Sequence, residues 1–197
     1  MTRNQDVAII EQNALALPSQ AKVKLKMCNL HLHSSGVFSN VYRGTLIEPQ
    51  PRREIALKKT WPEKADETRN IELLLLLALS RERHKNIVQV IFTFRTISDR
   101  KDKRICESMI FDFMPQTLTT TITEVFGPPM NVLDIKVYTW QLFNGLYFLL
   151  RKRICHRDIK PQNILIDPEL GLLKIGDFGS AKHMTNVVRS TPYQGSL

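Results

Sequence analysis

The chain has few cysteines and no long apolar run. Three of its 197 residues are cysteine (Cys28, Cys106 and Cys155), and their spacing fits neither a disulfide framework nor a zinc site. A sparse, odd set of thiols is typical of a reducing compartment, so we expect a cytoplasmic or nuclear protein. The most apolar stretch, Leu73 to Leu79, is too short to span a bilayer, and residues 1–10 lack the apolar core of a signal peptide. We therefore expect no membrane association.

The amino-acid composition indicates a globular protein with a sizeable core. Apolar residues make up 43% of the chain and charged residues 24%, which excludes a disordered chain and allows one domain or two small ones. The net charge of +9 favours anionic partners such as a nucleotide or an acidic peptide. Charge alone does not exclude nucleic acid, but the chain carries no nucleic-acid-binding motif, so we expect no such partner.

The first half of the chain has the pattern of an antiparallel meander. Residues 1–20 are interpreted as an N-terminal extension of uncertain order. From Lys22 apolar and charged residues alternate, which predicts a strand, and further strands are predicted around residues 41–47 and 55–58. A helix is predicted over residues 65–80, and two strands over 90–96 and 105–113 enclose a charged turn at 98–104.

The second half is predicted to be more helical. Residues 116–125 are weakly helical, and a strong helix is predicted over residues 131–153, followed by strands at 164–166 and 172–175. Apolar residues of the long helix recur at spacings of three and four, which predicts a face packed in the core. These residues are Ile135, Tyr138, Leu142, Leu146 and Leu149.

Two carboxylates and an amide follow the long helix at short intervals. Asp158 and Asn163 occupy a polar turn between apolar segments, and Asp177 follows a predicted strand. Carboxylate and amide oxygens are hard ligands suited to Mg²⁺ on nucleotide phosphates. Ordinary turn chemistry explains a single Asp or Asn at such a place, but it does not explain the whole set.

These residues belong to two strings that resemble a known family. His156-Arg157-Asp158-Ile159-Lys160-Pro161-Gln162-Asn163 is similar to the catalytic loop of serine/threonine protein kinases, and Asp177-Phe178-Gly179 follows at the expected distance. Asp167-Pro168 and Ser180-Ala181-Lys182 resemble the glycogen synthase kinase-3 (shaggy-like) family in particular. The resemblance runs from about residue 25 to the end.

The resemblance implies an ATP-dependent kinase that acts on protein substrates. Asp158 would accept the proton of the substrate hydroxyl, and Lys160 would neutralise charge on the γ-phosphate. Asn163 and Asp177 would hold Mg²⁺.

The resemblance also implies a lysine that holds the α- and β-phosphates, paired with a helix glutamate. Lys58 fits this role better than Lys59, because it ends the apolar-Ala-apolar string Ile55-Ala56-Leu57. Glu72 is the expected partner. Counting back from His84 places Leu75 at the glutamate position instead, so two registers stay open.

The phosphate loop and the adenine site are assigned by the same resemblance. The expected three glycines are Ser34, Gly36 and Ser39 here, followed by Val41, so only one glycine is present. Glycine at such positions lets backbone N–H groups approach phosphates closely. Ala56 would line the nucleotide site beside Lys58. Phe111 would narrow the back of the pocket, and the backbones of Asp112 and Met114 would bind adenine.

The family also uses three basic residues to bind substrates that already carry a phosphate. Arg157 and Lys182 match two of them. The third position is Ile71 here, with Arg69 nearby, so we expect an incomplete pocket.

Together these assignments predict an α+β, two-lobe protein-kinase-like fold. Its parts are an N-terminal extension (1–20), a β-rich N-lobe (21–114) and a partial helical C-lobe (115–197). No Ala-Pro-Glu string occurs before Leu197, so we expect a truncated C-lobe, nucleotide binding and slow phosphate transfer. A natural truncation, an incomplete gene model and a fragment all stay open. The alternative function is a non-catalytic, kinase-like scaffold, which the substituted phosphate loop favours.

Overall fold

The chain folds into two compact units. The computed structural model describes residues 8–62, 70–97, 105–123 and 130–184. The first unit comprises Met1–Leu73 with Gln89–Phe113, and the second Leu74–Val88 with Met114–Leu197. Among the residues described, no helix combines the length and the apolar character that a membrane span requires.

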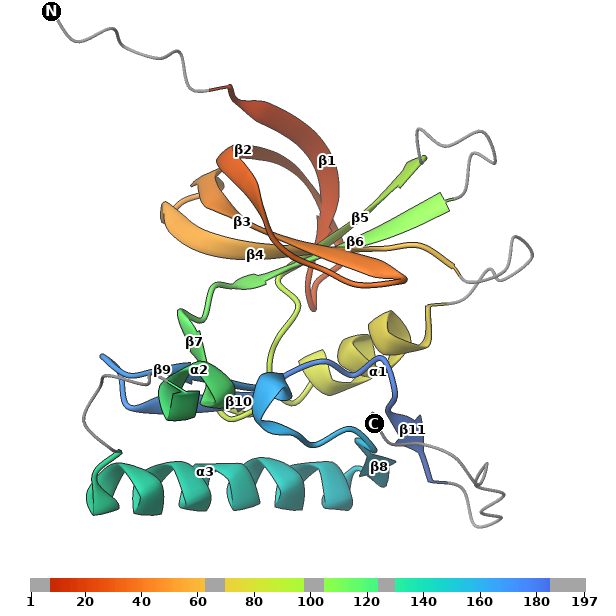
Figure 1. Cartoon of the computed structure of the whole chain (residues 1–197). Helices are drawn as coiled ribbons and strands as arrows, with labels where there is room; N and C mark the ends of the chain where they lie inside the picture. Colours follow the sequence, from red (N-terminus) through yellow and green to blue (C-terminus); the bar gives the residue numbers. More distant parts are fainter. Residues whose placement is uncertain (1–7, 63–69, 98–104, 124–129, 185–197) are drawn as a thin grey trace, which may run out of the picture. The chain divides into compact units, whose positions relative to one another are not determined.

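The first unit is a closed barrel of antiparallel strands in the order β1-β2-β3-β4-β6-β5 (Figure 1). Successive side chains of a strand point to opposite faces, so every second residue enters the barrel. Leu25, Leu46, Ile55 and Ile110 are fully buried there. The strands are β1 (Ile10–Ala16), β2 (Ala21–Ser35), β3 (Ser39–Glu48), β4 (Arg53–Thr60), β5 (Phe92–Ile97) and β6 (Ile105–Asp112). The predicted β-rich part of an α+β fold is confirmed.

Strand β1 lies within the stretch that the sequence analysis assigned to an N-terminal extension of uncertain order. It pairs with β2 along its whole length and with β5 at Leu15 and Ala16. Only Ala14 of β1 is buried, so the strand lacks the bulky alternating residues by which strands are recognised. It is held by backbone pairing, which composition does not reveal.

Helix α1 (Ile71–Ser80) follows Asn70, whose side-chain oxygen accepts a hydrogen bond from the Leu73 amide. That is the action of a helix N-cap. Leu76 and Leu79 of α1 are buried. Residues 65–69 of the predicted helix and the predicted turn at 98–104 lie outside the described residues.

The second unit places its strands beside a long helix. Strands β7, β9 and β10 form a sheet in the order β10-β9-β7, and β8 pairs with β11. The predicted long helix is present as α3, capped by Asn131. The elements are β7 (Gln116–Thr117), α2 (Leu118–Thr123), α3 (Val132–Arg151), β8 (Ile154–Cys155), the 3-10 turn η1 (Pro161–Asn163), β9 (Ile164–Asp167), β10 (Leu172–Ile175) and β11 (Lys182–His183).

The buried face of α3 is rotated from the predicted one. Tyr138 and Leu149 are buried as expected, but Ile135 is 48% exposed. The line facing β10 passes through Gln141 and Gly145 instead. A Cβ at Gly145 would lie 2.9 Å from Ile175 Cδ1 and 3.1 Å from the Asn86 carbonyl oxygen, so glycine allows the close approach. The apolar pattern misled because α3 carries apolar residues on both sides.

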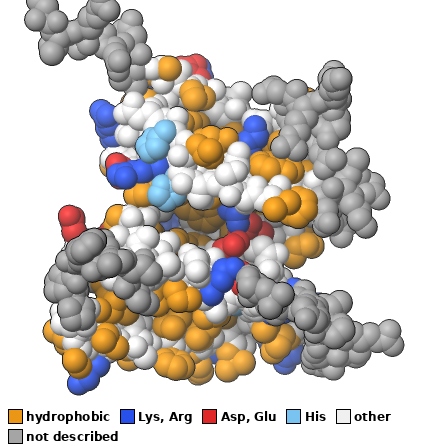
Figure 2. All heavy atoms as spheres, in the orientation of Figure 1, with side chains coloured by type: hydrophobic (Ala, Val, Ile, Leu, Met, Phe, Trp, Pro, Cys, Tyr) orange, Lys and Arg blue, Asp and Glu red, His pale blue; other side chains and the backbone are white. Residues whose placement is uncertain are grey.

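The other side of α3 is an exposed apolar surface. Figure 2 shows hydrophobic side chains gathered where this helix runs. Its most exposed large residues are Val132, Leu133, Trp140, Phe143, Tyr147 and Leu150. The Nζ of Lys85 lies 4.8 Å from the centre of the Trp140 ring, a cation–π contact on this surface.

Candidate active site

In the first unit, three adjacent strands bring predicted nucleotide-site residues into one row. Ser34 of β2 lies opposite Val41 of β3, and Val41 lies opposite Lys58 of β4. The hairpin between β2 and β3 closes through a bond from the Gly36 amide to the Ser39 carbonyl (2.7 Å). A Cβ at Gly36 would make only ordinary contacts, the nearest at 3.4 Å from the Ser39 carbonyl oxygen. The hairpin itself therefore does not require glycine.

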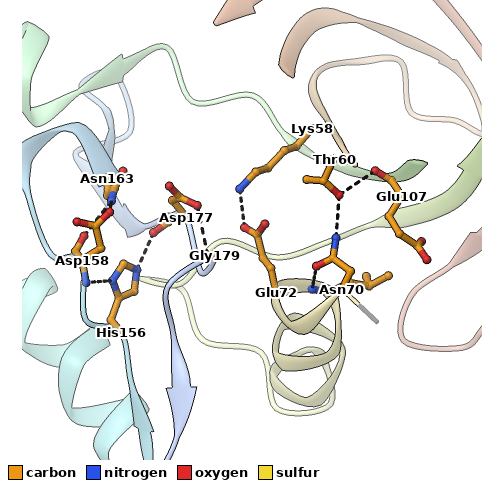
Figure 3. A network of polar contacts seen from close by, with 12 residues as sticks. Lys58, Thr60, Asn70, Glu72, Glu107, His156, Asp158, Asn163, Asp177 and Gly179 are labelled. Carbon is orange, nitrogen blue, oxygen red and sulfur yellow. Dashed lines mark hydrogen bonds and ion pairs between the residues drawn. The ribbon is translucent and has the colours of Figure 1, made fainter. Parts of the chain in front are cut away.

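Lys58 and Glu72 form a largely buried ion pair. Nζ of Lys58 lies 2.7 Å from Oε1 of Glu72, and the side chains are 15% and 7% exposed (Figure 3). Ile55 and Leu57 occupy the barrel core, so alternation turns Ala56 and Lys58 to the outer face of β4. Of the two registers left open, the one with Glu72 gives the contact, and Leu75 is buried as an apolar residue.

The predicted adenine-binding segment begins at Asp112, the last residue of β6. Phe111 pairs with Ala56 in the β4–β6 register. Asp112 Oδ1 lies 3.6 Å from Nη1 of Arg53, with the Asp112 side chain 53% exposed. The next amide, that of Phe113, donates to the Glu54 carbonyl (3.2 Å). Met114 belongs to the second unit.

In the second unit, His156 supports the loop between β8 and η1. It is 3% exposed, and its Nε2 lies 2.8 Å from the Gly176 carbonyl oxygen. The Asp158 amide donates to Nδ1 (3.3 Å), so the proton belongs on Nε2. The ring also meets the buried Phe178 edge-on at 4.9 Å. His156 thus connects the loop to the strand that precedes Asp177.

Asp158 is held by two neighbours from its own loop. Nδ2 of Asn163 donates to the backbone oxygen of Asp158 (2.8 Å) and to its Oδ2 (2.9 Å). The ammonium of Lys160 lies 3.0 Å from the same Oδ2. Asn163 is 7% exposed, so the amide is held in one orientation (Figure 3). A carboxylate that an amide holds in place can accept a proton from a bound hydroxyl. The lysine beside it can stabilise negative charge that develops nearby.

Asp177 directly follows Gly176, whose backbone is hydrogen-bonded to Asn163. The Gly176 amide donates to the Asn163 carbonyl (2.8 Å). Asp177 has φ 50, a left-handed conformation that is uncommon outside glycine, and its Oδ1 accepts from the Gly179 amide (3.4 Å). Because both amide hydrogens of Asn163 point to Asp158, its Oδ1 remains as an acceptor. An amide oxygen and a carboxylate fit a hard divalent cation.

The two basic residues predicted to bind a substrate phosphate are both in the second unit. Arg157 has φ 65, and its Nε donates to the Ser180 carbonyl (2.7 Å). Lys182 of β11 pairs with Cys155 of β8, two residues before Arg157. Ile71 is 51% exposed at the start of α1, and Arg69 lies outside the described residues.

Two sets of polar contacts were not predicted from the sequence. Nδ2 of Asn70 donates to the Thr60 hydroxyl oxygen (2.8 Å), between α1 and β4. In the second unit, Asn86 and Gln141 form a buried network (2.8 Å). An Asn directly before a helix was the available signal for Asn70. No local signal identifies the network, because its members are far apart in sequence.

Comparison with known proteins gives one family and several relatives. Residues 33–197 match the model of the protein kinase domain. The chain is 36% identical over 167 residues to the serine/threonine-protein kinase gskl-1 of Caenorhabditis elegans, covering 83% of this chain and 44% of the relative. It is 35% identical over 150 residues to the protein kinase gsk3 of Schizosaccharomyces pombe (75% and 37%). For the serine/threonine-protein kinase RIM11/MSD1 of Saccharomyces cerevisiae, identity is 37% over 152 residues (76% and 39%). The chain thus spans less than half the length of these relatives.

Proposed function

The chain belongs to the protein kinase domain family, and from that premise we propose that it serves to transfer the γ-phosphate of ATP to serine or threonine side chains of proteins. The family uses ATP and divalent metal ions, and the similarity to glycogen synthase kinase-3-like enzymes inferred from the motifs is confirmed. The observation that supports the proposal best is the position of Asp158, held by Asn163 and paired with Lys160.

In the proposed reaction, Asp158 orients the substrate hydroxyl and accepts its proton. Lys160 lies on the same carboxylate, so its ammonium is placed to offset the negative charge that develops on the transferred phosphoryl group. His156 acts through the loop backbone by holding the Asp158 amide. Phosphoryl transfer depends mainly on positioning and charge stabilisation, so a few fixed residues supply most of the effect.

The proposed nucleotide contacts divide between the two units. Lys58, held by Glu72, binds the α- and β-phosphates. Asn163 and Asp177 hold Mg²⁺, which would neutralise phosphate charge when bound. Each set is an element of the proposal, supported by the donor chemistry described above. The remaining proposed contacts are Ser34, Gly36, Ser39, Val41 and Ala56 around the phosphates and the base, and the backbones of Asp112 and Met114 at adenine.

We propose further that the protein substrates include ones that already carry a phosphate. Arg157 and Lys182 would bind that phosphate. Lys182 belongs to β11, which pairs with β8, and Arg157 follows β8 and donates to the Ser180 carbonyl just before β11. A matched pair of peptides that differ only in one phosphoserine tests this. Faster transfer to the phosphorylated peptide, lost in Lys182→Ala, is expected. Equal rates for the two peptides would contradict it.

The central test measures transfer from labelled ATP to a serine or threonine peptide. It uses the 197-residue chain and, alongside it, the protein encoded by the full transcript. We expect transfer that requires Mg²⁺ and falls about 10²- to 10⁴-fold in Asp158→Asn, the range for loss of a general base. Nucleotide binding without any transfer by either protein would favour the non-catalytic scaffold, for which Ser34 and Ser39 at glycine positions argue.

We propose that the protein is located in the cytoplasm or nucleus. The support is the small, odd set of cysteines, Cys28, Cys106 and Cys155, whose spacing fits no disulfide framework. Imaging of the tagged protein in its native cell checks this, and a secretory location would contradict it.

A further inference from the structure

Asn70, directly before α1, makes hydrogen bonds in two directions. Its Oδ1 accepts from the Leu73 amide (2.9 Å), which caps the helix. Its Nδ2 donates to the Thr60 hydroxyl oxygen at the end of β4 (2.8 Å). Thr60 in turn donates to the backbone oxygen of Glu107 on β6 (3.2 Å). One amide therefore connects the start of α1 to two strands of the barrel (Figure 3).

The same two elements carry the ion pair of the candidate site. Lys58 lies two residues before Thr60 on β4, and Glu72 lies two residues after Asn70 on α1. The hydrogen bond and the ion pair thus join one strand to one helical turn. Ile71, between Asn70 and Glu72, is 51% exposed, so it does not hold this turn against β4, whereas Leu73 in the same turn is buried.

A cap alone does not require asparagine here. An N-cap needs only a side-chain acceptor, and Ser or Asp caps a helix about as well as Asn. Of these capping side chains, only asparagine also offers an amide donor, and Asn70 uses it for Thr60. The hydrogen bond from Asn70 to Thr60 is therefore separate from the capping of α1.

We propose that the Asn70–Thr60 hydrogen bond is a clamp that positions α1 so that Glu72 reaches Lys58. Asn70 and Thr60 are positioning residues, which act through the ion pair and touch no substrate. The proposal deepens the proposed function and rests on it where it concerns ATP. Without the clamp, the first turn of α1 moves away from β4, and Lys58 loses the carboxylate that holds its ammonium.

Three variants separate the clamp from the cap. Thr60→Val removes the hydroxyl with little change of shape and keeps a residue that suits a strand. Thr60→Ser keeps the hydroxyl and is the matched control. Asn70→Asp keeps the cap acceptor but has no hydrogen to donate to Thr60. The full 197-residue chain is used throughout.

The first measurement follows the ion pair without nucleotide. Limited acylation of lysines, read by mass spectrometry, reports how readily the Lys58 amine is released from its partner. We expect Lys58 to label several times faster in Thr60→Val and in Asn70→Asp than in the wild type and Thr60→Ser. Lys59 provides an internal reference in every sample. Equal Lys58 labelling in Thr60→Val and the wild type would overturn the inference.

The second measurement compares the dissociation constants of MgATP and adenosine. Because Lys58 is proposed to bind phosphates, Thr60→Val should weaken ATP binding about two- to tenfold, the effect of one hydrogen bond. Adenosine binding should not change, whereas general destabilisation would weaken both ligands. In a Glu72→Gln background, Thr60→Val should have no further effect on ATP.

The outcomes separate the inference from the proposed function. A wild-type chain that binds ATP no more tightly than adenosine contradicts the role of Lys58 at phosphates, while the labelling result still tests the clamp. A wild-type preference for ATP that Thr60→Val leaves unchanged contradicts the clamp alone.

Discussion

Oε1 of Glu72 lies 2.7 Å from Nζ of Lys58, and neither side chain is more than 15% exposed. A buried pair of this kind is asymmetric in its energetics. The attraction offsets the cost of removing both charges from water, but loss of one partner leaves the other charge buried and uncompensated. The pair therefore behaves as a unit.

Single substitutions in this pair should each be severe. We expect Lys58→Met or Glu72→Gln to lower the free energy of unfolding by about 3–5 kcal/mol, measured by urea denaturation. The double variant should lose clearly less than the sum, because no lone charge remains. Lys59→Met, on the alternate face of β4, is the matched control and should change stability by less than about 1 kcal/mol. Additive losses would show that Glu72 is not the energetic partner of Lys58.

Nucleotide should stabilise the chain through Asp177. At a ligand concentration of about 100 Kd, MgATP should raise the free energy of unfolding by about 2.7 kcal/mol, seen as a thermal shift. In Asp177→Asn the Mg²⁺-dependent part of this thermal shift should be smaller. With ATP and a metal chelator, the variant and the wild type should show the same shift.

The control for that experiment is Asn131→Ala. Asn131 caps α3 through the Asp134 amide (2.8 Å), so its loss should lower stability by about 1 kcal/mol. The increment produced by MgATP should stay the same. An unchanged Mg²⁺ response in Asp177→Asn would place the cation elsewhere.

Sequence predicted those features that are encoded by local strings. The spacing of Asp158 and Asn163 was sufficient to expect them together, because five residues in one turn leave few geometries. Lys58 followed from the apolar-Ala-apolar pattern of its strand. The roles of these residues remain predictions.

Features that depend on pairing between distant segments could not be predicted in the same way. Strand β1 is held by backbone pairing with β2 and β5, and its side chains carry little signal. Contact between Asn70 and Thr60 depends on where β4 ends relative to α1. The buried face of α3 is set by Gly145 and Gln141 against β10, whereas the apolar pattern alone pointed to Ile135.

Stability should fall in mild acid because of His84. Burial, with a smaller effect from Lys85, lowers the pKa of His84 below its usual value of about 6.5. Nδ1 of His84 accepts the Asn86 amide (3.2 Å), and the ring stacks on Phe148 at 4.8 Å. Below pH 6.5 the unfolded chain binds more protons than the folded one. The contribution is therefore complete above pH 6.5 and is lost as pH falls through the folded pKa.

The measurement compares the wild type with His84→Phe, which keeps the stacking but cannot titrate. Urea unfolding at pH 7.5 and 5.5 gives the stability difference between the two proteins at each pH. All other titratable groups are shared, so the change in that difference isolates His84. We expect the stability of the wild type relative to His84→Phe to be lower at pH 5.5 than at pH 7.5, and a difference that does not change with pH would contradict this.

Substitution of Gln141 in α3 should destabilise the second unit. Its Oε1 accepts from Nδ2 of Asn86 (2.8 Å) and from the Leu173 amide (2.9 Å), and its Nε2 donates to the Gly171 carbonyl (2.7 Å). Gln141→Met keeps the volume but leaves buried partners unsatisfied, so we expect a loss of about 1–3 kcal/mol in the free energy of unfolding. Thr139→Met, at an exposed position of the same helix, is the control and should stay within about 0.5 kcal/mol. Equal effects of the two changes would show that water satisfies the network without Gln141.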